Sequence, residues 1–294
     1  MNIINKISII TLTYKNLHLL SNAISSVNSQ VIDSKYGVEY LVVDDCSPNF
    51  NREYVESKLE SCSFQCRLII NPKNLGTVKS FNQAILGSTG DVIIPLSADD
   101  EFYDENVVGN IIDEFETSQE LIITGIRVPV KDNTELNPLP LIKDRHFFQS
   151  RTSLLNRIAS RKNIISGAST YYHRKVFDEI DFFDESYRLL EDYPFYLKAL
   201  ASDVNIHFLD RKVIRYGTEG ITSSGQINPV LKDDVRKSYR YAISLGILDY
   251  SQMRFVFYSK ILNRNEQIKF SNLLKYPEQF LYLCFLKVIY IMKR

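Results

Sequence analysis

Cysteine is scarce in this chain, and the spacing of its few copies indicates neither a metal site nor a disulfide framework. Among 294 residues there are four cysteines, at positions 46, 62, 66 and 284, and no two of them form a CxxC pair. Cys62 and Cys66 lie close together, but a metal site would need a second pair that the sequence lacks. We therefore expect reduced, unpaired thiols, as in a cytosolic protein.

Long apolar runs are missing as well. No stretch approaches the roughly 18–20 consecutive apolar residues that a membrane-spanning helix needs. The chain starts MNIINKISIITLTY, whose apolar part is short and lacks a small-residue cleavage site, so we expect no signal peptide. With 45% apolar and 24% charged residues, the composition is that of a globular protein with a sizeable core. The expected localisation is cytoplasmic.

Glycine-rich phosphate loops are absent where two nucleotide-binding classes require them. After the first apolar segment the chain reads TLTYKN, without glycine. A dinucleotide-dependent dehydrogenase needs GxGxxG at this turn, and a nucleotidyltransferase needs a glycine-rich loop for its triphosphate. The sequence therefore argues against both classes, although a nucleotidyltransferase would share the α/β sheet and the metal-binding carboxylates.

The net charge is zero, yet the charges are unevenly distributed along the chain. Residues 225–294 hold 12 Lys/Arg against 5 Asp/Glu, a net charge of +7, and the remainder holds 23 against 30, a net charge of −7. The basic part suggests contact with anionic phospholipid or nucleic acid, although a solvated helical surface explains it equally well. No recognisable nucleic-acid-binding module accompanies it, so we expect no nucleic-acid partner.

The last segment, residues 277–294, begins with proline and ends with two basic residues. Residues 280–292 are apolar except for Lys287, and this run is too short to span a bilayer. The segment fits a helix that lies in the lipid headgroup plane with its basic residues on anionic lipid. The alternative is a terminal helix packed on the protein's own body.

The first half of the chain alternates between predicted strands and predicted helices. Short β-branched and apolar runs predict the strands, and apolar residues at helical spacing predict the helices. Such alternation implies crossover connections and a mostly parallel sheet covered on both faces. The predicted strands are Lys6–Leu12, Val38–Val43, Arg67–Ile70 and Asp91–Leu96, and the predicted helices are Asn16–Gln30, Asn51–Cys62, Gly76–Leu86 and Asn106–Glu116.

The second half is less regular but continues the pattern. Two further predicted strands, Leu121–Val130 and Val204–Arg215, enclose two predicted helices, Thr152–Ser160 and Leu190–Leu200. Asn137–Leu141 reads NPLPL, which predicts a loop or linker.

Two acidic pairs directly follow two of the predicted strands. Asp44-Asp45 and Asp99-Asp100 stand just past strand ends, where ligands of open parallel sheets bind. Carboxylates grouped in one place repel one another unless a cation or a donor-rich ligand lies among them. A single Asp at such a position would suit a helix N-cap, but two pairs favour a binding site.

Taken in order, six motifs resemble the inverting glycosyltransferases of family 2, which have the GT-A fold. Each motif alone is weak, but their order and spacing are specific, and the resemblance runs from about Lys6 to about Ser224, some three quarters of the chain. The resemblance implies an α/β GT-A domain, a mostly parallel Rossmann-like sheet flanked by helices, over residues 1–224, with a basic helical extension over residues 225–294. The motifs are SIITLTYKN, VVDDCSPN, NPKNLGTVKSFNQA, LSADD, ISGAS and LLEDYPFYLK.

The resemblance also implies which residues bind the nucleotide. In the family, the turn after the first strand packs on base and ribose, and the next acidic motif binds the uracil edge. Asp44 matches the uracil-binding position with Asp45 as its neighbour, and Lys79 stands where the family often has Arg. A Lys offers charge to the diphosphate without a bidentate fork. The full implied set is Thr11, Thr13, Tyr14, Asp44, Asp45, Asn74, Gly76, Lys79, Ser97 and Ala98.

LSADD resembles the DxD motif that holds Mn²⁺ or Mg²⁺ in the family. The resemblance assigns Asp99, followed by Asp100, as metal ligands; such cations prefer oxygen ligands and neutralise the leaving diphosphate. Ser97 departs from the pattern, because the family usually has Asp there. Gly217 stands where many members have Arg, and Glu219 stands near the position of a family His.

LLEDYPFYLK resembles the family's ED motif, which implies that Asp192 is the general base and that Glu191 positions it or the donor sugar. A sugar hydroxyl is a poor nucleophile, and a carboxylate within hydrogen-bond reach accepts its proton. Taken alone, the pair would be explained as negative charge at a helix N-terminus. Gly167 and Ala168 of ISGAS would line the sugar pocket.

The expected function is metal-dependent, inverting transfer of a sugar from a nucleotide-sugar, in particular a UDP-sugar, to a glycan or a lipid-linked saccharide. Such a hexosyltransferase-type enzyme would serve surface polysaccharide biosynthesis, and residues 277–294 would hold it at the inner face of the cell membrane. The alternative is a catalytically weak or inactive GT-A-like domain that binds nucleotide-sugar or glycan, which the departures at Ser97 and Glu219 motivate.

Overall fold

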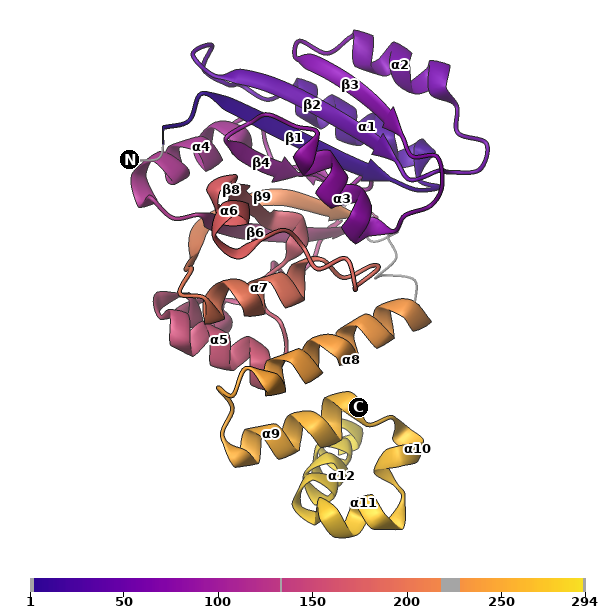
Figure 1. The fold of residues 1–294 in the computed structure, drawn as a ribbon, viewed down its shortest axis with the longest axis vertical. Helices are drawn as coiled ribbons and strands as arrows, with labels where there is room; N and C mark the ends of the chain where they lie inside the picture. The colour runs from indigo at the N-terminus through magenta and orange to yellow at the C-terminus, as the bar shows by residue number, and fades with distance from the viewer. Residues whose placement is uncertain (1–2, 133, 218–227, 293–294) are drawn as a thin grey trace.

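The chain folds around one mixed sheet that has helices on both of its faces (Figure 1). The computed structural model describes residues 3–132, 134–217 and 228–292. Along the sheet the strands follow the order β3-β2-β1-β4-β8-β6-β9-β5, and β7 pairs with β6.

The N-terminal half of the sheet is parallel, as the alternation of strands and helices predicts. β1 pairs with β2 and β4, and β2 pairs with β3, all in parallel. The ends of β1 and β2 therefore meet at one edge, where Thr13 stands opposite Asp44. The elements along the chain up to residue 118 are β1 (Lys6–Thr13), α1 (Leu17–Asn28), β2 (Gly37–Asp44), α2 (Arg52–Glu60), β3 (Gln65–Ile70), α3 (Thr77–Leu86), β4 (Val92–Pro95), β5 (Glu101–Phe102) and α4 (Val107–Ser118). Of these, β5 does not belong to the parallel half but forms the opposite edge of the sheet.

The middle of the sheet is antiparallel, because a short strand that the sequence analysis did not predict inserts there. β8 (Thr170–His173) is antiparallel to β4 and to β6 (Ile122–Lys131). β9 (Ile206–Gly217) is parallel to β6 and antiparallel to β5, and β7 (Thr134–Glu135) forms a short hairpin with β6. The predicted α/β sheet flanked by helices is confirmed, and β8 gives it its mixed character.

Two apolar cores cover the two faces of the sheet, and alternate residues of each strand supply them. In β1, Ile9 belongs to the core beneath α1, α2 and α4, and Ile10 belongs to the core beneath α3, α7 and α8. Tyr40 and Leu41 of β2 divide between the two cores in the same way. Since successive strand residues point to opposite faces, these cores fix the register of the strands and the position of the edge where they end.

The helical C-terminal region expected after residue 225 is present. Tyr239 and Ala242 of α8, together with Ile261, belong to the same apolar core as α7. The expected boundary between residues 224 and 225 lies outside the described residues, so the division into domains stays a prediction. The remaining elements are a 3₁₀ helix (Ile142–Gln149), α5 (Arg151–Ser160), a 3₁₀ turn (Gly167–Ser169), α6 (Lys175–Ile180), α7 (Asp192–Ala201), α8 (Pro229–Ser244), α9 (Tyr250–Val256), a π-helical turn (Phe257–Ile261), α10 (Arg264–Gln267), α11 (Phe270–Lys275) and α12 (Pro277–Met292).

Candidate active site

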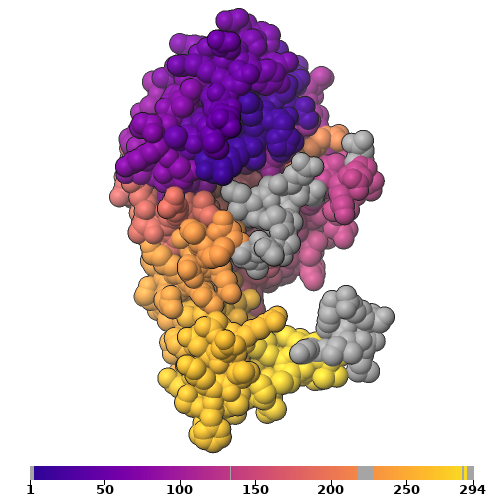
Figure 2. All heavy atoms as spheres, turned by 90° about the vertical axis from the view of Figure 1, so that its right-hand side faces the viewer, coloured from indigo at the N-terminus to yellow at the C-terminus, as the bar shows by residue number. Residues whose placement is uncertain are grey.

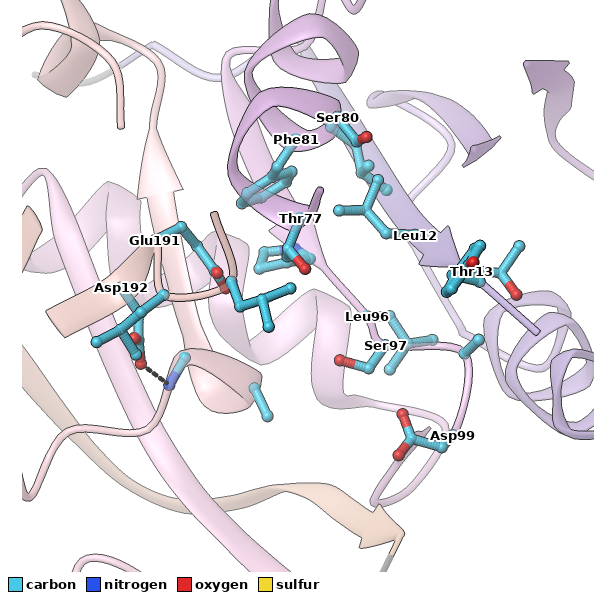
Figure 3. A pocket seen from close by; sticks show the side chains of 18 of the residues that line it. Leu12, Thr13, Thr77, Ser80, Phe81, Leu96, Ser97, Asp99, Glu191 and Asp192 are labelled. Carbon is cyan, nitrogen blue, oxygen red and sulfur yellow. Dashed lines mark hydrogen bonds between the residues drawn. The ribbon is translucent and has the colours of Figure 1, made fainter. Parts of the chain in front are cut away.

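A cavity of about 420 Å³ opens at the carboxyl ends of β1 and β4. The first turn of α3 and the start of α7 also contribute to its lining. Figure 3 shows Glu191 and Asp192 on one wall and Thr13, Ser97 and Asp99 on the other. The predicted site residues in its lining are Thr13, Tyr14, Asp45, Ser97, Ala98, Asp99, Gly167, Ala168, Glu191 and Asp192.

Two buried polar atoms without a partner mark the ends of β1 and β2. Thr13 and Asp44 are neighbours in the strand register and are 4% and 0% exposed. Oδ2 of Asp44 accepts a hydrogen bond from the amide of Ser47 at 2.8 Å, whereas Asp44 Oδ1 and Thr13 Oγ1 have no partner among the described residues. Because buried polar atoms in native proteins are normally hydrogen-bonded, these two atoms favour a ligand at this edge.

The Asp45 carboxylate holds the segment that leads into α3. It accepts hydrogen bonds from the amides of Leu75 at 2.8 Å and Gly76 at 2.9 Å, and from the hydroxyl of Ser80 at 2.8 Å. Asn74 donates to the main-chain oxygen of Asp45 at 3.3 Å. These contacts fix the first turn of α3 beside the cavity, although Asn74 and Gly76 do not belong to its described lining.

Three further predicted nucleotide-binding residues lie outside the described lining: Asp44, Thr11 and Lys79. Thr11 is fully buried, and its Oγ1 accepts a hydrogen bond from the Tyr40 hydroxyl at 3.0 Å. Lys79 lies on α3 with Nζ at 3.6 Å from Oε2 of Glu185. Their assignment to the nucleotide stays a prediction.

Asp99 and Asp100 follow β4, as predicted, but their surroundings differ. Asp99 lines the cavity, while Asp100 is 1% exposed and accepts a hydrogen bond from the amide of Gly217 at 3.0 Å through Oδ1. Oδ2 of Asp100 has no partner within the part of the chain that is described. Burial, and then the negative charge of Asp99, raises the pKa of Asp100 well above its usual value. A cation beside both carboxylates would offset this penalty.

Gly217, the last residue of β9, closes over this acidic loop. Its amide binds Asp100, and a Cβ at this position would overlap the main-chain oxygen of Asp99. The close approach explains physically why the chain has Gly where many family members have Arg. Glu219, the other departure, lies outside the described residues.

The donor groups fit a divalent cation that is shared with a diphosphate. Mn²⁺ and Mg²⁺ prefer oxygen ligands, and Mg²⁺ is usually bound by one or two carboxylates together with substrate phosphates and water. Asp99 and Asp100 provide such carboxylates, and Oδ2 of Asp100 is an acceptor that still lacks a donor. Within residues 3–132, 134–217 and 228–292, no cluster of three or more His, Cys, Asp or Glu side chains forms a metal site from protein groups alone.

Asp192 begins α7 and is held by two main-chain amides. The amide of Gly167 donates to its Oδ2 at 3.1 Å, and the amide of Tyr193 donates to its Oδ1 at 2.6 Å. A Cβ at Gly167 would lie 2.9 Å from Oδ2, so this position has no room for a side chain unless the carboxylate moves. Burial raises the pKa of Asp192, and the two amides and the positive charge of Arg127 oppose the rise.

Glu191 precedes α7 and lines the same cavity. Burial, and then the charge of Asp192, raises the pKa of Glu191 to about 8. A carboxyl group with such a pKa can take up or release a proton near neutral pH, and adjacent titratable groups of this kind are typical of catalytic sites.

Arg127, on β6, is a cavity residue that the sequence analysis missed. Its guanidinium lies 4.1 Å from the ring centroid of Tyr216, and its Nε has no partner among the described residues. Its positive charge lowers the pKa values of both Asp100 and Asp192. Arg127 is the single charged residue in LIITGIRVPV, a segment that otherwise predicts a buried strand. This exception to the pattern could have indicated a functional residue.

Several solved structures share this fold. TarS residues 1–349 from S. aureus, in complex with UDP-GlcNAc, match with a TM-score of 0.64 and 19% identity over 94% of this chain and 79% of that chain. GalNAc-T7 with UDP, GalNAc and Mn²⁺ matches with a TM-score of 0.63 and 13% identity over 94% of this chain and 54% of that chain. The mannosyltransferase PcManGT from Pyrobaculum calidifontis, with GDP-Man and Mn²⁺, matches with a TM-score of 0.56 and 15% identity over 81% and 64% of the two chains.

These likenesses concern the fold, since all identities are low, and the chain spans 44% of the longer TarS chain. No curated protein sequence matches the chain. The family model for glycosyl transferase family 2 matches residues 8–181, which is more than half of the sequence and includes β1 to β8. The chain therefore belongs to glycosyl transferase family 2.

Proposed function

We propose that the protein transfers a sugar from a UDP-sugar to a hydroxyl of a glycan or lipid-linked saccharide, with inversion at the anomeric carbon. The observation that carries the proposal is the single cavity that Asp99 and Asp192 line from opposite walls (Figure 3). A diphosphate held near Asp99 would present its sugar toward Asp192. The test is turnover of UDP-sugars in the presence of Mn²⁺.

The nucleoside is expected at the ends of β1 and β2. Asp44 Oδ1 is an acceptor without a donor, and the N–H group of a uracil ring could supply one. The Thr13 hydroxyl, which also has no partner among the described residues, could donate to a carbonyl oxygen of the same ring. Tyr14 lines the cavity beside them and offers an aromatic face. Calorimetry with UDP and GDP tests this assignment, because Asp44→Ala should weaken UDP binding and reduce the preference for UDP.

Asp99 and Asp100 would hold the divalent cation, with Ser97 nearby on the same loop. The cation supplies positive charge that stabilises the diphosphate as a leaving group. The protein contributes a rigid loop, since the amide of Gly217 fixes Asp100 and leaves Asp99 facing the cavity.

Asp192 would accept the proton of the acceptor hydroxyl as that oxygen attacks the anomeric carbon. The amides of Gly167 and Tyr193 fix its carboxylate, so it can act without reorganising. Attack on the face opposite the leaving diphosphate inverts the centre and requires no second nucleophilic carboxylate. Arg127 would favour the ionised form of Asp192, and Glu191 would position the donor sugar or the base.

The rival is a GT-A-like domain that binds a nucleotide-sugar without turnover. Ser97, at the first position of the DxD-like motif, favours it because one family carboxylate is missing. Calorimetry that shows UDP binding independent of Mn²⁺, with no sugar released, would support this rival against the transferase.

We further propose that the C-terminal helices contact a membrane that carries a lipid-linked acceptor. The described helices include none that could cross a bilayer. On α12, however, Leu281, Phe285 and Val288 are 66%, 62% and 53% exposed, so this part of the helix does not pack on the body. In Figure 2 the helices that follow α8 form the end of the molecule opposite β1–β3. The basic charge of residues 225–294 complements an anionic lipid surface.

Sedimentation with phosphatidylglycerol vesicles tests the membrane contact. A Leu281→Glu/Phe285→Glu variant should lose binding by more than about tenfold, since each buried apolar side chain contributes roughly 1.5–3 kcal/mol. Val31→Glu is the matched control, because Val31 is 61% exposed and lies between α1 and β2, outside the C-terminal helices. Equal binding of both variants to the vesicles, or no binding by the wild type, would contradict the membrane contact. If the protein self-associates and only the α12 variant loses this, the exposed face of α12 binds a second copy of the chain instead.

A further inference from the structure

A second cavity lies beside the candidate active site, and the proposed transfer makes no use of it. It has a volume of about 830 Å³ and lies between α7, α8 and the loop 181–187, with Asn82 of α3 at its edge. None of its lining residues belongs to the predicted site. Its size suits a ligand as large as a short oligosaccharide.

The inner wall of this cavity is aromatic. Phe183, Tyr187 and Phe195 are buried there, and the ring centroids of Phe183 and Phe195 lie 4.5 Å apart. Phe182 and Tyr241 are only partly buried, so their rings offer accessible apolar surface. Flat, amphipathic surfaces of this kind match the C–H faces of pyranose rings.

The rim of the cavity carries charges of both signs in equal number. Its cations are Lys198, Lys237 and Arg240, and its anions are Asp181, Asp184 and Glu185. Ammonium and guanidinium groups only donate hydrogen bonds, whereas carboxylates only accept them. Sugar hydroxyls do both, so they suit this rim, whose charges cancel and give no net attraction to an anionic or a cationic ligand.

Some of these charged groups already have partners that hold them in place. Lys237 lies over the Tyr187 ring at 3.9 Å and donates to the hydroxyl of Ser186. Glu185 pairs with Lys79 at 3.6 Å. The rim is therefore partly organised before any ligand binds, which lowers the cost of ordering it.

The two cavities share their supporting elements. Asp192 at the start of α7 lines the first, and Lys198 of the same helix lines the second, about 9 Å further along the helix axis. On α8, Leu231 lines the first cavity and Tyr241 lines the second. The two cavities therefore border the same two helices, α7 and α8.

We propose that the second cavity is a saccharide-binding site that holds the inner sugars of a neutral glycan acceptor while its terminal hydroxyl reaches Asp192. The role in acceptor selection rests on the proposed function, but saccharide binding by itself does not. Tyr241 provides the stacking surface, and Arg240 and Asp184 bind hydroxyl groups. Shorter acceptors that end at Asp192 do not reach this site.

Binding to an array of neutral oligosaccharides of increasing length, with uronic-acid and sulfated counterparts, tests the site without donor. The wild type should bind neutral members, and Tyr241→Ala should weaken binding about tenfold, as loss of an aromatic contact does. Arg240→Ala, which removes an exposed side chain, should weaken it with an unchanged Tm. Tyr54→Ala on α2 is the matched control, because Tyr54 is 38% exposed far from the cavity. Absence of saccharide binding, binding that both variants retain, or preference for acidic members would overturn the proposal.

Kinetics with acceptors of different length separate this inference from the proposed function. In Tyr241→Ala, KM should rise about tenfold for long acceptors, while KM for short acceptors and the rate of UDP-sugar hydrolysis stay unchanged. If the wild type turns over no UDP-sugar but array binding still depends on Tyr241, the transferase proposal fails and the saccharide site stands. If KM rises equally for short and long acceptors, the second site is not an extension of the acceptor path.

Discussion

The main-chain amide of Gly167 donates a hydrogen bond to Oδ2 of Asp192 at 3.1 Å, and the two residues are 25 positions apart in the sequence. The turn that carries Gly167 leads directly into β8, and Asp192 begins α7. A main-chain donor cannot rotate away as a side chain can, so it holds the carboxylate in one orientation. The pair thus joins the ISGAS and ED segments of the sequence into one piece of the cavity wall.

Substitution Gly167→Ala should lower kcat by about 10- to 100-fold, since a displacement of about 1 Å at a reacting group can cost that much. The added Cβ would lie 2.9 Å from Oδ2 of Asp192 and push the carboxylate out of place. UDP affinity should not change, because the nucleoside is expected near Asp44. Gly109→Ala is the control, since its Cβ would find only ordinary contact, 3.5 Å from the oxygen of Val31. Equal kcat values for both variants and the wild type would show that Gly167 does not position the base.

The pH dependence of kcat should have its acid limb well above the ordinary carboxyl range. Burial raises the pKa values of Glu191, to about 8, and of Asp192, and a general base works only when it is ionised. Activity should therefore fall as pH falls through the raised pKa values of the pair. Glu191→Gln should remove any titration near pH 8 and leave the limb that reports Asp192, because Glu191 is already uncharged below its own pKa. A limb near pH 4, the ordinary value for carboxyl groups, would contradict the assignment.

The same pair should reduce the stability of the fold at mildly alkaline pH. The folded-state pKa of Glu191 exceeds its unfolded value, so the stabilisation from its protonated form is complete below the unfolded pKa and is lost as pH rises through about 8. At alkaline pH, Glu191→Gln should then have a higher free energy of unfolding than the wild type, by on the order of 1 kcal/mol, and a higher unfolding temperature. At acid pH the difference should be smaller. Thermal unfolding monitored by circular dichroism measures this, and Glu60→Gln at an exposed position should have no effect.

Gly217→Ala should raise the Mn²⁺ concentration required for half-maximal activity by roughly tenfold, as loss of a group that supports a metal ligand does. The new methyl group would overlap the main-chain oxygen of Asp99 and disturb the amide bond to Asp100. Gly37→Ala is the comparison, because its Cβ would lie an ordinary 3.4 Å from the nearest side-chain atom. An unchanged Mn²⁺ requirement in Gly217→Ala would argue against a metal at this loop.

The regular part of the fold could be predicted because its signals are local. The buried residues of α1 are Leu20, Ala23, Ile24 and Val27, which repeat at helical spacing. β8 has no such signal: its four residues are all buried, so they do not alternate, and both of its partner strands are distant in sequence. Its place in the middle of the sheet depends on tertiary pairing that a single sequence does not reveal.

The site residues, too, could be predicted only where the signal is local in the sequence. Acidic residues at the ends of β2 and β4 could be placed together, because the ends of parallel strands meet at one edge. Which of the two adjacent carboxylates faces the cavity depends on the turn after the strand: Asp45 and Asp99 belong to the described lining, whereas Asp44 and Asp100 do not. Arg127 could not be predicted as a site residue, because its role depends on residues that are close in space but distant in sequence, such as Asp192.

Whether Asp192 is the base for sugar transfer can be measured as the kcat of Asp192→Asn with a UDP-sugar, Mn²⁺ and a glycan acceptor. We expect a drop of about 10²–10⁴-fold with UDP affinity and Tm preserved, because the amide keeps the shape of the carboxylate but cannot accept the proton. Transfer at the wild-type rate by this variant would contradict it.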